Sequence, residues 1–472
     1  MAAEGSARDR RRPKAALFLF VCGWAGIAPH WLDPQRAFLP AITLALMLGG
    51  YGLRTVFHGP RRHQATNPEG AAGEPASALQ EGSPGSGGWA PPVDVVVAAR
   101  DEEAVVGRLV ERLAALHWPD DRLRLWVIDD GSEDRTPQLL AELQGRIPQL
   151  NVLRRSRDAG GGKSAALNMA LTRLRAPWML VLDADADLQA DTLERLIPYA
   201  ERGGWAAVQL RKAVVNSGAN LLTRAQAMEM VLDAEVQQGR LAAGGVAELR
   251  GNGQLLRREA VFAAGGFNEA TVTDDLDLTF RFLLAGQPIG LLWNPPVREE
   301  AVLSLRALWR QRQRWAEGGL QRFFDYWPQL LGRRLSRRQR LDLGCFFLLQ
   351  YALPVTSAAD LLGSLATRTP PAYWPLSIVG VGLSGAAIVR GCRRASDGPP
   401  LPDAHALGLA LGLLYLMHWF VVIPWVTLRM ALLPKRLVWA KTLHLGDHPP
   451  AAEREADAGE GEGELTPEPG QV

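Results

Sequence analysis

Residues 181–188, which read V-L-D-A-D-A-D-L, decide the fold of this chain. They complete an apolar run, residues 178–182, whose length and composition predict a short buried strand. The carboxylates of Asp183, Asp185 and Asp187 occupy alternate positions, so in an extended segment they would converge on one site. Carboxylates that close together repel one another unless a cation lies between them. Such oxygen ligands suit Mg²⁺ or Mn²⁺ bridging to substrate phosphates, whereas a solvated Asp-rich turn is the alternative interpretation.

The segment before this motif alternates between strand-like and helix-like patterns. Strands are predicted at residues 93–99, 123–128, 151–153 and 178–182, and helices at residues 102–116, 136–143 and 163–174. This alternation predicts an α/β domain with a mostly parallel sheet flanked by helices. Ligands of such sheets bind beyond the carboxyl ends of the strands, where Asp129, Asp130 and the Asp183 motif all lie. Two acidic clusters at one sheet edge favour a binding site over a solvated turn.

A glycine-rich segment, G-G-G-K-S at residues 160–164, precedes one of the predicted helices. It is similar to a P-loop, but the G-x-x-x-x-G-K spacing is missing, which argues against an ATPase. A glycine-rich turn into a helix N-terminus, with Lys163 there, is nevertheless a good contact for a diphosphate.

A third acidic segment, T-V-T-D-D-L-D-L-T-F, covers residues 271–280. Thr273 and its neighbours can cap the helix that follows, which is the structural explanation. Capping needs one acidic residue, and this segment has three. Asp277 is assigned a structural role, whereas Asp274 and Asp275 are candidates for a general base, because like-charge crowding can raise the pKa of one of them towards neutrality.

The apolar residues of the flanking segments indicate a membrane protein. Apolar runs cover residues 15–28, 37–53, 341–366, 371–389 and 404–433, the last broken by Pro424. Arginines and lysines flank these runs, and the positive-inside rule places those basic ends and the α/β domain in the cytoplasm. A third C-terminal crossing would put the tail outside, whereas Arg429 and Lys435 favour the cytoplasm, so the last run is either a crossing or partly interfacial. Asp360 should face protein or a polar lumen rather than lipid.

Composition and length place these features in six segments. With 472 residues and a net charge of +2, the chain suits two to three domains and has no overall field that attracts nucleic acid. Cys22, Cys345 and Cys392 lie far apart and are expected to be buried and unpaired. The predicted segments are an N-terminal transmembrane hairpin (1–58), a disordered linker (59–92), the α/β domain (93–300), amphipathic interface helices (301–340), a C-terminal transmembrane region (341–445) and a disordered acidic tail (446–472).

The predicted interface segment is aromatic and basic over residues 303–327. An amphipathic helix of this composition lies on a membrane surface. A second face of the same helix would place Gln311, Arg314 and Trp315 over a charged ligand.

Four ordered motifs resemble the membrane-embedded, inverting family 2 glycosyltransferases, which include cellulose and hyaluronan synthases. These motifs are D-D-G-S at 129–132, D-A-D at 183–185, T-D-D at 273–275 and Q-R-Q-R-W at 311–315. The resemblance implies a GT-A fold for residues 93–300, flanked by transmembrane helices. The resemblance also implies that Asp129 or Asp130 binds the uridine and that Lys163 binds the diphosphate. It implies that Asp183 contacts the nucleotide and the metal, and that Asp185 binds Mg²⁺ or Mn²⁺. Asp275 would be the general base, and Gln311, Arg314 and Trp315 would cover the pyrophosphate.

Longer segments are similar to the cyanobacterial β-monoglucosyldiacylglycerol synthases. They include L-R-G-N-G-Q at 249–254, N-P-P-V at 294–297 and R-W-A-E-G-G-L-Q-R-F-F-D-Y-W at 314–327. This similarity implies transfer of glucose from UDP-glucose to diacylglycerol with inversion, by a multi-pass protein of the plasma or thylakoid membrane. A processive polysaccharide synthase and a catalytically silent membrane scaffold are the alternatives. The residues alone do not fix the donor sugar, the acceptor or the oligomeric state.

Overall fold

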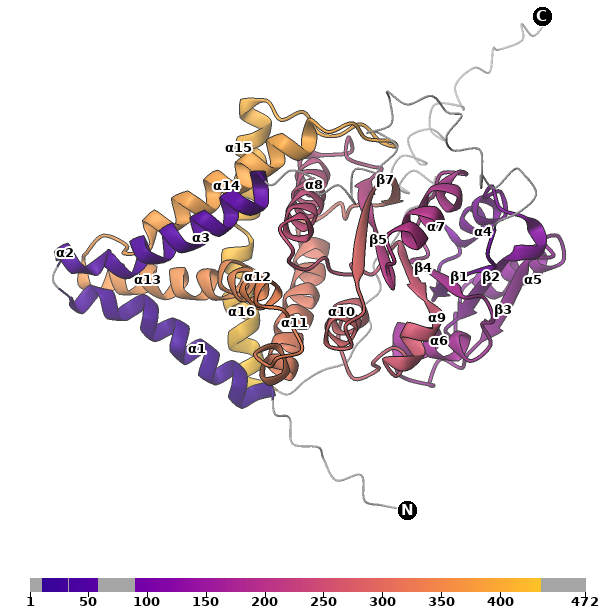
Figure 1. Cartoon of the computed structure of the whole chain (residues 1–472), viewed down its shortest axis with the longest axis horizontal. Helices are drawn as coiled ribbons and strands as arrows, with labels where there is room; N and C mark the ends of the chain where they lie inside the picture. The colour runs from indigo at the N-terminus through magenta and orange to yellow at the C-terminus, as the bar shows by residue number, and fades with distance from the viewer. Residues whose placement is uncertain (1–10, 33, 58–89, 434–472) are drawn as a thin grey trace, which may run out of the picture.

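The computed structural model of the chain describes residues 11–32, 34–57 and 90–433. The predicted linker, up to residue 89, and the predicted acidic tail lie outside the described residues. An α/β domain forms one end of the molecule, and a group of long helices forms the other (Figure 1). The two ends are joined by helices α8 (Leu221–Ala242) and α11 (Leu305–Leu330).

One seven-stranded sheet forms the α/β domain, in the order β3-β2-β1-β4-β6-β5-β7. β6 pairs antiparallel with both of its neighbours and the other pairings are parallel, so the prediction of a mostly parallel sheet is confirmed. The strands are β1 (Val93–Ala99), β2 (Leu123–Asp129), β3 (Leu150–Arg154), β4 (Trp178–Leu182), β5 (Ala207–Val214), β6 (Gln254–Arg257) and β7 (Ile289–Glu299).

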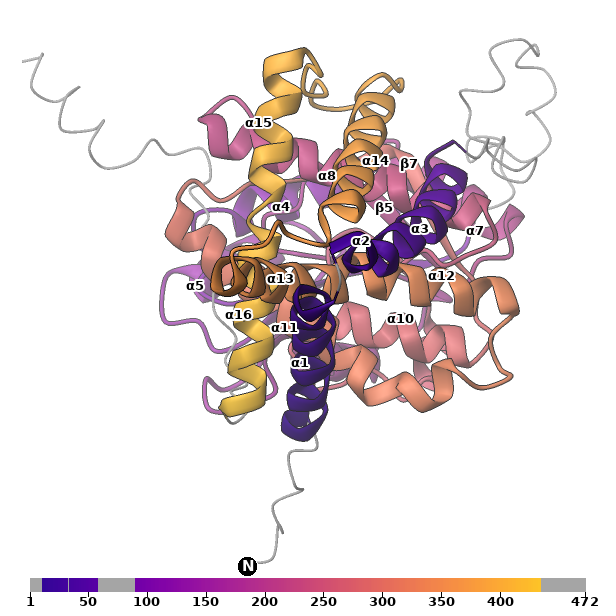
Figure 2. The ribbon, with the colours of Figure 1, turned by 90° about the vertical axis from the view of Figure 1, so that its left-hand side faces the viewer.

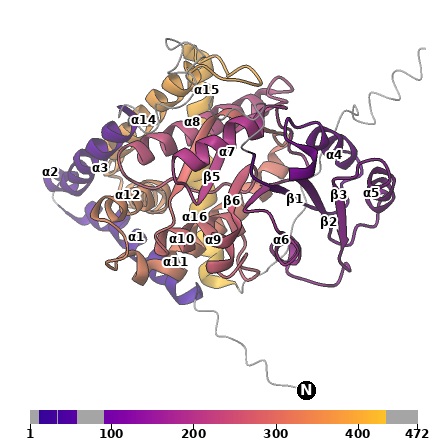
Figure 3. The same cartoon turned by 45° about the vertical axis from the view of Figure 1, so that its right-hand side comes forward.

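Helices cover both faces of this sheet (Figure 3). Successive side chains of a strand point to opposite faces, so Val95 and Val97 pack on one side and Val96 and Ala98 on the other. The first core is closed by α4 (Val106–Ala114), α5 (Thr136–Gln144) and α7 (Thr192–Arg202). The second is closed by α6 (Gly162–Leu171), α9 (Arg258–Ala263) and α10 (Asp274–Leu284). Both faces of the sheet are therefore buried, so a ligand can reach the sheet only at the ends of its strands.

Four helical segments of the described chain are long and apolar enough to cross a membrane: α3 (Leu39–Phe57), Arg337–Thr367, α14 (Trp374–Cys392) and Ala406–Leu432. Arg337–Thr367 consists of α12 (Arg337–Phe347), a π-helical segment η5 (Leu348–Ala352) and α13 (Leu353–Thr367). Ala406–Leu432 consists of α15 (Ala406–Leu416) and α16 (Trp419–Leu432). The first predicted run forms α1 (Arg11–Ile27), whose 17 residues include basic side chains in its first turn.

The predicted break in the last apolar run is wrong in position. α15 ends at Leu416 and α16 begins at Trp419, whereas Pro424 lies inside α16. A proline removes one helical hydrogen bond. Here the flanking residues Ile423 and Val426 are fully buried, and their packing holds the helix through that position.

Asp360 confirms the expectation that it faces protein. Its carboxylate lies 2.9 Å from His30 Nε2 and accepts hydrogen bonds from the backbone N–H groups of Ala372 and Tyr373 at 2.8 and 3.1 Å. His30 lies in the connection between α1 and α3, and Ala372 lies in the connection between α13 and α14. One carboxylate therefore bonds these two connections together. It therefore has a structural role.

A buried carboxylate joins the α/β domain to the helices. Glu248, which is fully buried, lies 3.2 Å from Arg240 of α8, 2.7 Å from Arg250 and 3.0 Å from Arg322 of α11. We call these four residues the Glu248 cluster. The three guanidinium groups hold the pKa of Glu248 well below its ordinary value, against the opposing effect of burial. Arg240 also lies 2.9 Å from Asp342 of α12.

Replacing Glu248 with Gln keeps the size of the side chain but removes the negative charge shared by the buried Arg240 and Arg322 and the partly exposed Arg250. We expect the free energy of unfolding to fall by about 3–5 kcal/mol, as for other broken buried ion pairs. Thermal unfolding in detergent, followed by circular dichroism, measures the change. The matched control is Glu111→Gln, because Glu111 and Arg146 form an exposed pair at 2.8 Å whose loss changes stability by less than about 1 kcal/mol. Equal unfolding midpoints for the two variants would contradict the expectation.

Candidate active site

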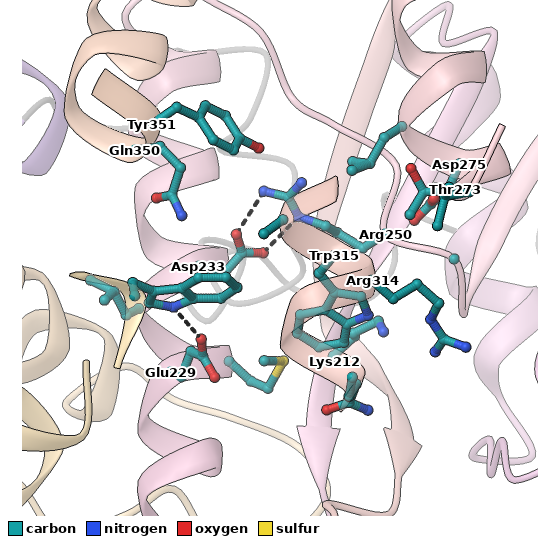
Figure 4. Close-up of a pocket in the computed structure, with 18 of the residues that line it drawn as sticks. Lys212, Glu229, Asp233, Arg250, Thr273, Asp275, Arg314, Trp315, Gln350 and Tyr351 are labelled. Carbon is teal, nitrogen blue, oxygen red and sulfur yellow. Dashed lines mark hydrogen bonds and ion pairs between the residues drawn. The ribbon is translucent and has the colours of Figure 1, made fainter. Parts of the chain in front are cut away.

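A cavity of about 980 Å³ opens at the carboxyl ends of β1 and β4 and continues between the long helices. At the sheet end it is lined by Gly160, Lys163, Asp183, Asp185 and Asp275, and at the other end by α3, η5 and α14. Figure 4 shows its middle part, where side chains from β5, α8, α11 and η5 face the same space. The topology predicted from the strand pattern therefore puts Asp183 and Asp185, at the end of β4, where a ligand can reach them.

The three aspartates after β4 do not converge as predicted. Residues 184 and 185 form a turn, closed by a 3.1 Å hydrogen bond from Ala186 N–H to the Asp183 carbonyl. Asp183 and Asp185 line the cavity, whereas Asp187 pairs with Arg112 at 2.5 Å and Arg298 at 2.9 Å. The alternation argument fails at Asp187 because the strand ends at Leu182 and the turn changes the direction of the chain.

Two lysines face the carboxylates of the cavity. Lys163, in the first turn of α6, forms an ion pair with Asp183, and its Nζ lies 3.5 Å from the Gly251 carbonyl. Lys212 of β5 lies 3.0 Å from Glu299 at the end of β7. Burial alone would raise the pKa of Asp183, but Lys163 beside it holds that pKa below its ordinary value.

Asp185 has the opposite electrostatic environment. Burial, then the neighbouring charges of Asp183 and Glu299, raise its pKa to about 8. A divalent cation would offset that excess of negative charge, so the carboxylate oxygens of Asp183 and Asp185 fit the metal site that the motif implies. The described part of the chain contains no group of three or more His, Cys, Asp or Glu side chains that could hold a metal ion. A cation here would therefore take its remaining ligands from diphosphate oxygens and water.

The acidic segment at the start of α10 faces the same cavity. Thr273 is the residue before α10, but its side chain makes no capping hydrogen bond, so capping does not explain the motif. Burial, then the charge of Asp274, raise the pKa of Asp275 to about 6, a value suited to a general base. Asp277 instead lies 2.7 Å from Arg281 and accepts a hydrogen bond from Tyr326 at 2.9 Å, which confirms its structural role.

Close approach to Asp275 is possible because the facing residue is Gly251. A Cβ on this glycine would lie 3.3 Å from Asp275 Oδ2, and its φ of +86° is one that other residues rarely adopt. The neighbouring Asn252 accepts a 3.1 Å hydrogen bond from the Asp183 N–H through its Oδ1. The segment 250–252 thus connects the turn that carries Asp183 and Asp185 to the candidate base.

Helix α11 brings the Q-R-Q-R-W motif to the cavity. Gln311, Arg314 and Trp315 line it, and Arg314 is close enough to help lower the pKa of Asp183. The second residue of the motif, Arg312, is buried. It donates 2.7 Å to Gln311, forms an ion pair with Glu229 of α8, and its guanidinium carbon lies 4.0 Å from the centre of the Trp315 ring. Arg312 therefore positions its two functional neighbours.

The D-D-G-S residues lie just behind the cavity wall, which Arg100 and Asp101 form at this edge. Asp129 accepts a 2.9 Å hydrogen bond from the N–H of Ser132, and Asp130 forms an ion pair with Arg155. Uridine binding by Asp129 or Asp130 stays a prediction.

Several cavity residues were not predicted from the sequence. They are Lys212, Glu229, Asp233, Arg250, Gln350 and Tyr351. Arg250 pairs with Asp233 at 2.8 Å, and the indole N–H of Trp419 donates to Glu229 at 2.9 Å (Figure 4). Each of these contacts joins residues that are distant in sequence, so periodicity gives no signal for them.

Comparison with known proteins gives one consistent family. Residues 91–318 match the profile described as "Glycosyltransferase like family 2". The chain is 43% identical to the β-monoglucosyldiacylglycerol synthase of Synechocystis sp. over 92% of this chain and 89% of that protein. It is 42% identical to the synthase of that name from Nostoc sp., over 92% of this chain and 90% of the relative.

A solved structure shares the fold. It is the mannosyltransferase PcManGT from Pyrobaculum calidifontis in complex with GDP-Man and Mn²⁺, with a TM-score of 0.54 at 19% identity, covering 79% of this chain and 99% of that one. The GT-A fold expected from the motifs is therefore confirmed. With the sheet, the ordered motifs and near-complete coverage of its relatives, the chain belongs to glycosyltransferase family 2.

Proposed function

We propose that this enzyme transfers glucose from UDP-glucose to diacylglycerol with inversion, giving β-monoglucosyldiacylglycerol. Three β-monoglucosyldiacylglycerol synthases are 41–43% identical to this chain over 92% of its length. The observation that carries the proposal is the continuity of the cavity. One space joins the carboxylates of Asp183 and Asp275 to apolar side chains such as Leu349, Leu353 and Leu383 of the long helices. A polar donor and an apolar acceptor can therefore meet in it.

The proposed chemistry is a single in-line displacement. Asp275 accepts the proton of the acceptor hydroxyl while that oxygen attacks the anomeric carbon, and the bond between this carbon and the diphosphate oxygen breaks. Lys163, Arg314 and Trp315 hold the departing diphosphate. A divalent cation held by Asp183 and Asp185 supplies further stabilisation of the charge on this leaving group. No protein nucleophile is needed, so the configuration at the anomeric carbon inverts.

A processive polysaccharide synthase needs a polar channel through its spans. Asp360 could line such a channel if it faced a polar lumen, but its carboxylate is bonded to His30 and to two backbone N–H groups. The residues of α3 and α14 that line the cavity carry no charge, and only Tyr51, Thr55, Ser377 and Ser384 among them are polar. These observations favour a lipid acceptor.

We also infer that the catalytic domain and both described ends of the chain lie on the cytoplasmic side. Arg337, Arg338, Arg390 and Arg393 mark the two ends of the α12–α14 hairpin nearest the α/β domain. The side chain of Arg12 donates 2.9 Å to the Leu432 carbonyl, so the start of α1 and the end of α16 lie together.

The same arrangement bears on the last apolar run. α15 packs against α8, where Gly408 and Gly412 face Met228, and α16 ends beside α11, where Arg429 pairs with Glu317. Figures 1 and 2 both show α15 and α16 following one another across the direction of α13. A segment with both ends against the cytoplasmic elements runs along the membrane surface, which leaves its described end, Leu433, on the cytoplasmic side.

The activity is tested with purified protein, Mg²⁺, radiolabelled UDP-glucose and dioleoylglycerol in mixed micelles, with thin-layer chromatography of the products. We expect a single monoglucosyl lipid. Asp275→Asn should lower kcat by about 10²–10⁴-fold, the usual range for a lost general base, with KM for UDP-glucose nearly unchanged. Label that is insoluble in water, not extractable as lipid and digestible to oligosaccharides would instead identify a polymer synthase. Full activity of Asp275→Asn would refute the base assignment.

The pH dependence of kcat/KM should report the ionisation of Asp275, which must be deprotonated to act as a base. Its pKa of about 6 predicts a plateau at higher pH and a fall of about tenfold per pH unit below that value. Asp274→Asn removes the neighbouring charge that raises this pKa, so the acid limb should move to lower pH. Rates measured at saturating cation from about pH 5 to pH 8 test this, and an unmoved limb would argue against Asp275 as the titrating base.

Chelation by EDTA should abolish activity, and Mg²⁺ or Mn²⁺ should restore it. Asp185→Asn should raise the cation concentration for half-maximal rate by about tenfold or more, since losing even an outer-shell partner typically lowers metal affinity by about that factor. Asp187→Asn is the control, because Asp187 belongs to a structural pair with Arg112 and Arg298. The same cation dependence in both variants, or activity that neither cation restores, would count against the metal role.

A further inference from the structure

The cavity changes character along its length. At the sheet end its wall is charged, with Asp183, Lys212 and Asp275. Beyond the Asp233–Arg250 pair the wall is formed by helical segments that are long enough to cross a membrane. The residues of α3, η5 and α14 that line it are uncharged and mostly apolar or glycine, with the polar side chains of Tyr51, Thr55, Gln350, Ser377 and Ser384 among them. We call this second part the apolar chamber. Its lining includes Gly52, Leu349, Leu353, Gly380, Leu383 and Leu416.

The boundary between the two parts is formed by a departure from regular helix. The segment η5 (Leu348–Ala352) is π-helical, with α-helix on both sides. Such π segments inside α-helices are rare and frequently occur at functional sites. This one presents Gln350 and Tyr351 to the cavity beside the Asp233–Arg250 pair (Figure 4). Gln350 is half-buried, so its amide is accessible to a ligand.

Tyr351, by contrast, is fixed in the protein. Its hydroxyl lies against Gly319 of α11, where a Cβ would be only 2.0 Å away, so only glycine fits there. Two adjacent residues of the π segment thus have different contacts. Tyr351 packs against α11, and Gln350 faces the cavity where the apolar chamber begins.

We propose that the apolar chamber holds the acyl chains of the acceptor and that the Gln350 amide contacts its glycerol backbone. This inference rests on the proposed function and deepens it by assigning the part of the protein that recognises the lipid. The occupant is a neutral glycerolipid with two acyl chains and one free hydroxyl. An amide can donate to an ester carbonyl and accept from a hydroxyl, which suits a ligand without charge.

Two observations favour this occupant. The chamber is continuous with the space around Asp275, so a lipid whose chains lie in it can present its hydroxyl to the base. The whole cavity, about 980 Å³, lies at the upper end of the range of about 300–1,000 Å³ for a single-ligand pocket. The cavity is therefore large for one ligand, and part of it is left for the acceptor when the donor occupies the sheet end.

The chamber offers a matched pair of positions for a test. Gly380 lines it, and a Cβ added there would meet no heavy atom within 4 Å. Gly382, two residues further along α14, also has no atom within 4 Å but does not line the cavity. A large side chain can therefore be added at either position without a clash at its Cβ, and only the one at Gly380 takes up room in the chamber.

Gly380→Phe and Gly382→Phe are compared in the full-length protein with dioleoylglycerol and with the short-chain dioctanoylglycerol. We expect Gly380→Phe to lower kcat/KM for dioleoylglycerol by about tenfold or more, corresponding to about 1.4 kcal/mol. It should retain most of its activity with dioctanoylglycerol and an unchanged KM for UDP-glucose. Gly382→Phe should behave like the parent enzyme with both acceptors. Matching unfolding midpoints show that both variants are folded.

The outcomes separate this inference from the proposed function. An unmodified enzyme that glucosylates neither diacylglycerol would overturn the acceptor itself. An active enzyme in which Gly380→Phe and Gly382→Phe show the same ratio of activities for the two chain lengths would overturn the chamber alone. Gln350→Leu should raise the KM for both diacylglycerols without changing that for UDP-glucose, and an unchanged KM for both would overturn the contact with the glycerol backbone.

Discussion

The ion pairs around the buried Glu248 carboxylate connect the catalytic domain to the helices that follow it. Arg240 lies on α8, and Arg250 comes directly before Gly251, which faces the candidate base. Arg322 lies on α11, two turns after the Q-R-Q-R-W motif. These ion pairs hold the segments in one arrangement, because a displacement of α11 would take the buried Arg322 guanidinium away from the Glu248 carboxylate. The relative positions of base, diphosphate cover and acceptor space depend on that carboxylate.

The site itself is organised by an imbalance of charge. Asp183 is neutralised by Lys163, whereas Asp185 and Asp275 lie beside further carboxylates and have raised pKa values. Neighbouring carboxylates have a different effect at each of these residues. Near Asp185 their negative charge favours binding of a cation, and near Asp275 it favours a proton acceptor that is active close to neutral pH. Residues of similar chemistry thus acquire different roles from their neighbours.

Local patterns in the sequence predicted β1, β2 and β4 closely, because apolar residues dominate these strands. β5 was not predicted, since it contains Gln209, Arg211 and Lys212, whose partners come from distant segments: Gln209 donates to Asn252 and Arg211 to Trp293. α8 was missed for the same reason, because its carboxylates Glu229 and Asp233 pair with arginines elsewhere in the chain. The motifs located the catalytic half of the site, while the acceptor half depends on contacts between segments far apart in sequence.

The contact between the start of α1 and the end of α16 has a consequence for biosynthesis. Arg11 pairs with Glu317 and Arg12 binds the carbonyl of Leu432, so α1 meets these partners only after α11 and α16, several hundred residues later, have been made. Until α11 and α16 are made, the basic turn of α1 must stay in water or among lipid headgroups. Domains generally fold as units during synthesis, so the α/β domain can form before the helices around it close. Emergence of α16, rather than of α1, then sets the moment at which the membrane-facing half can assemble.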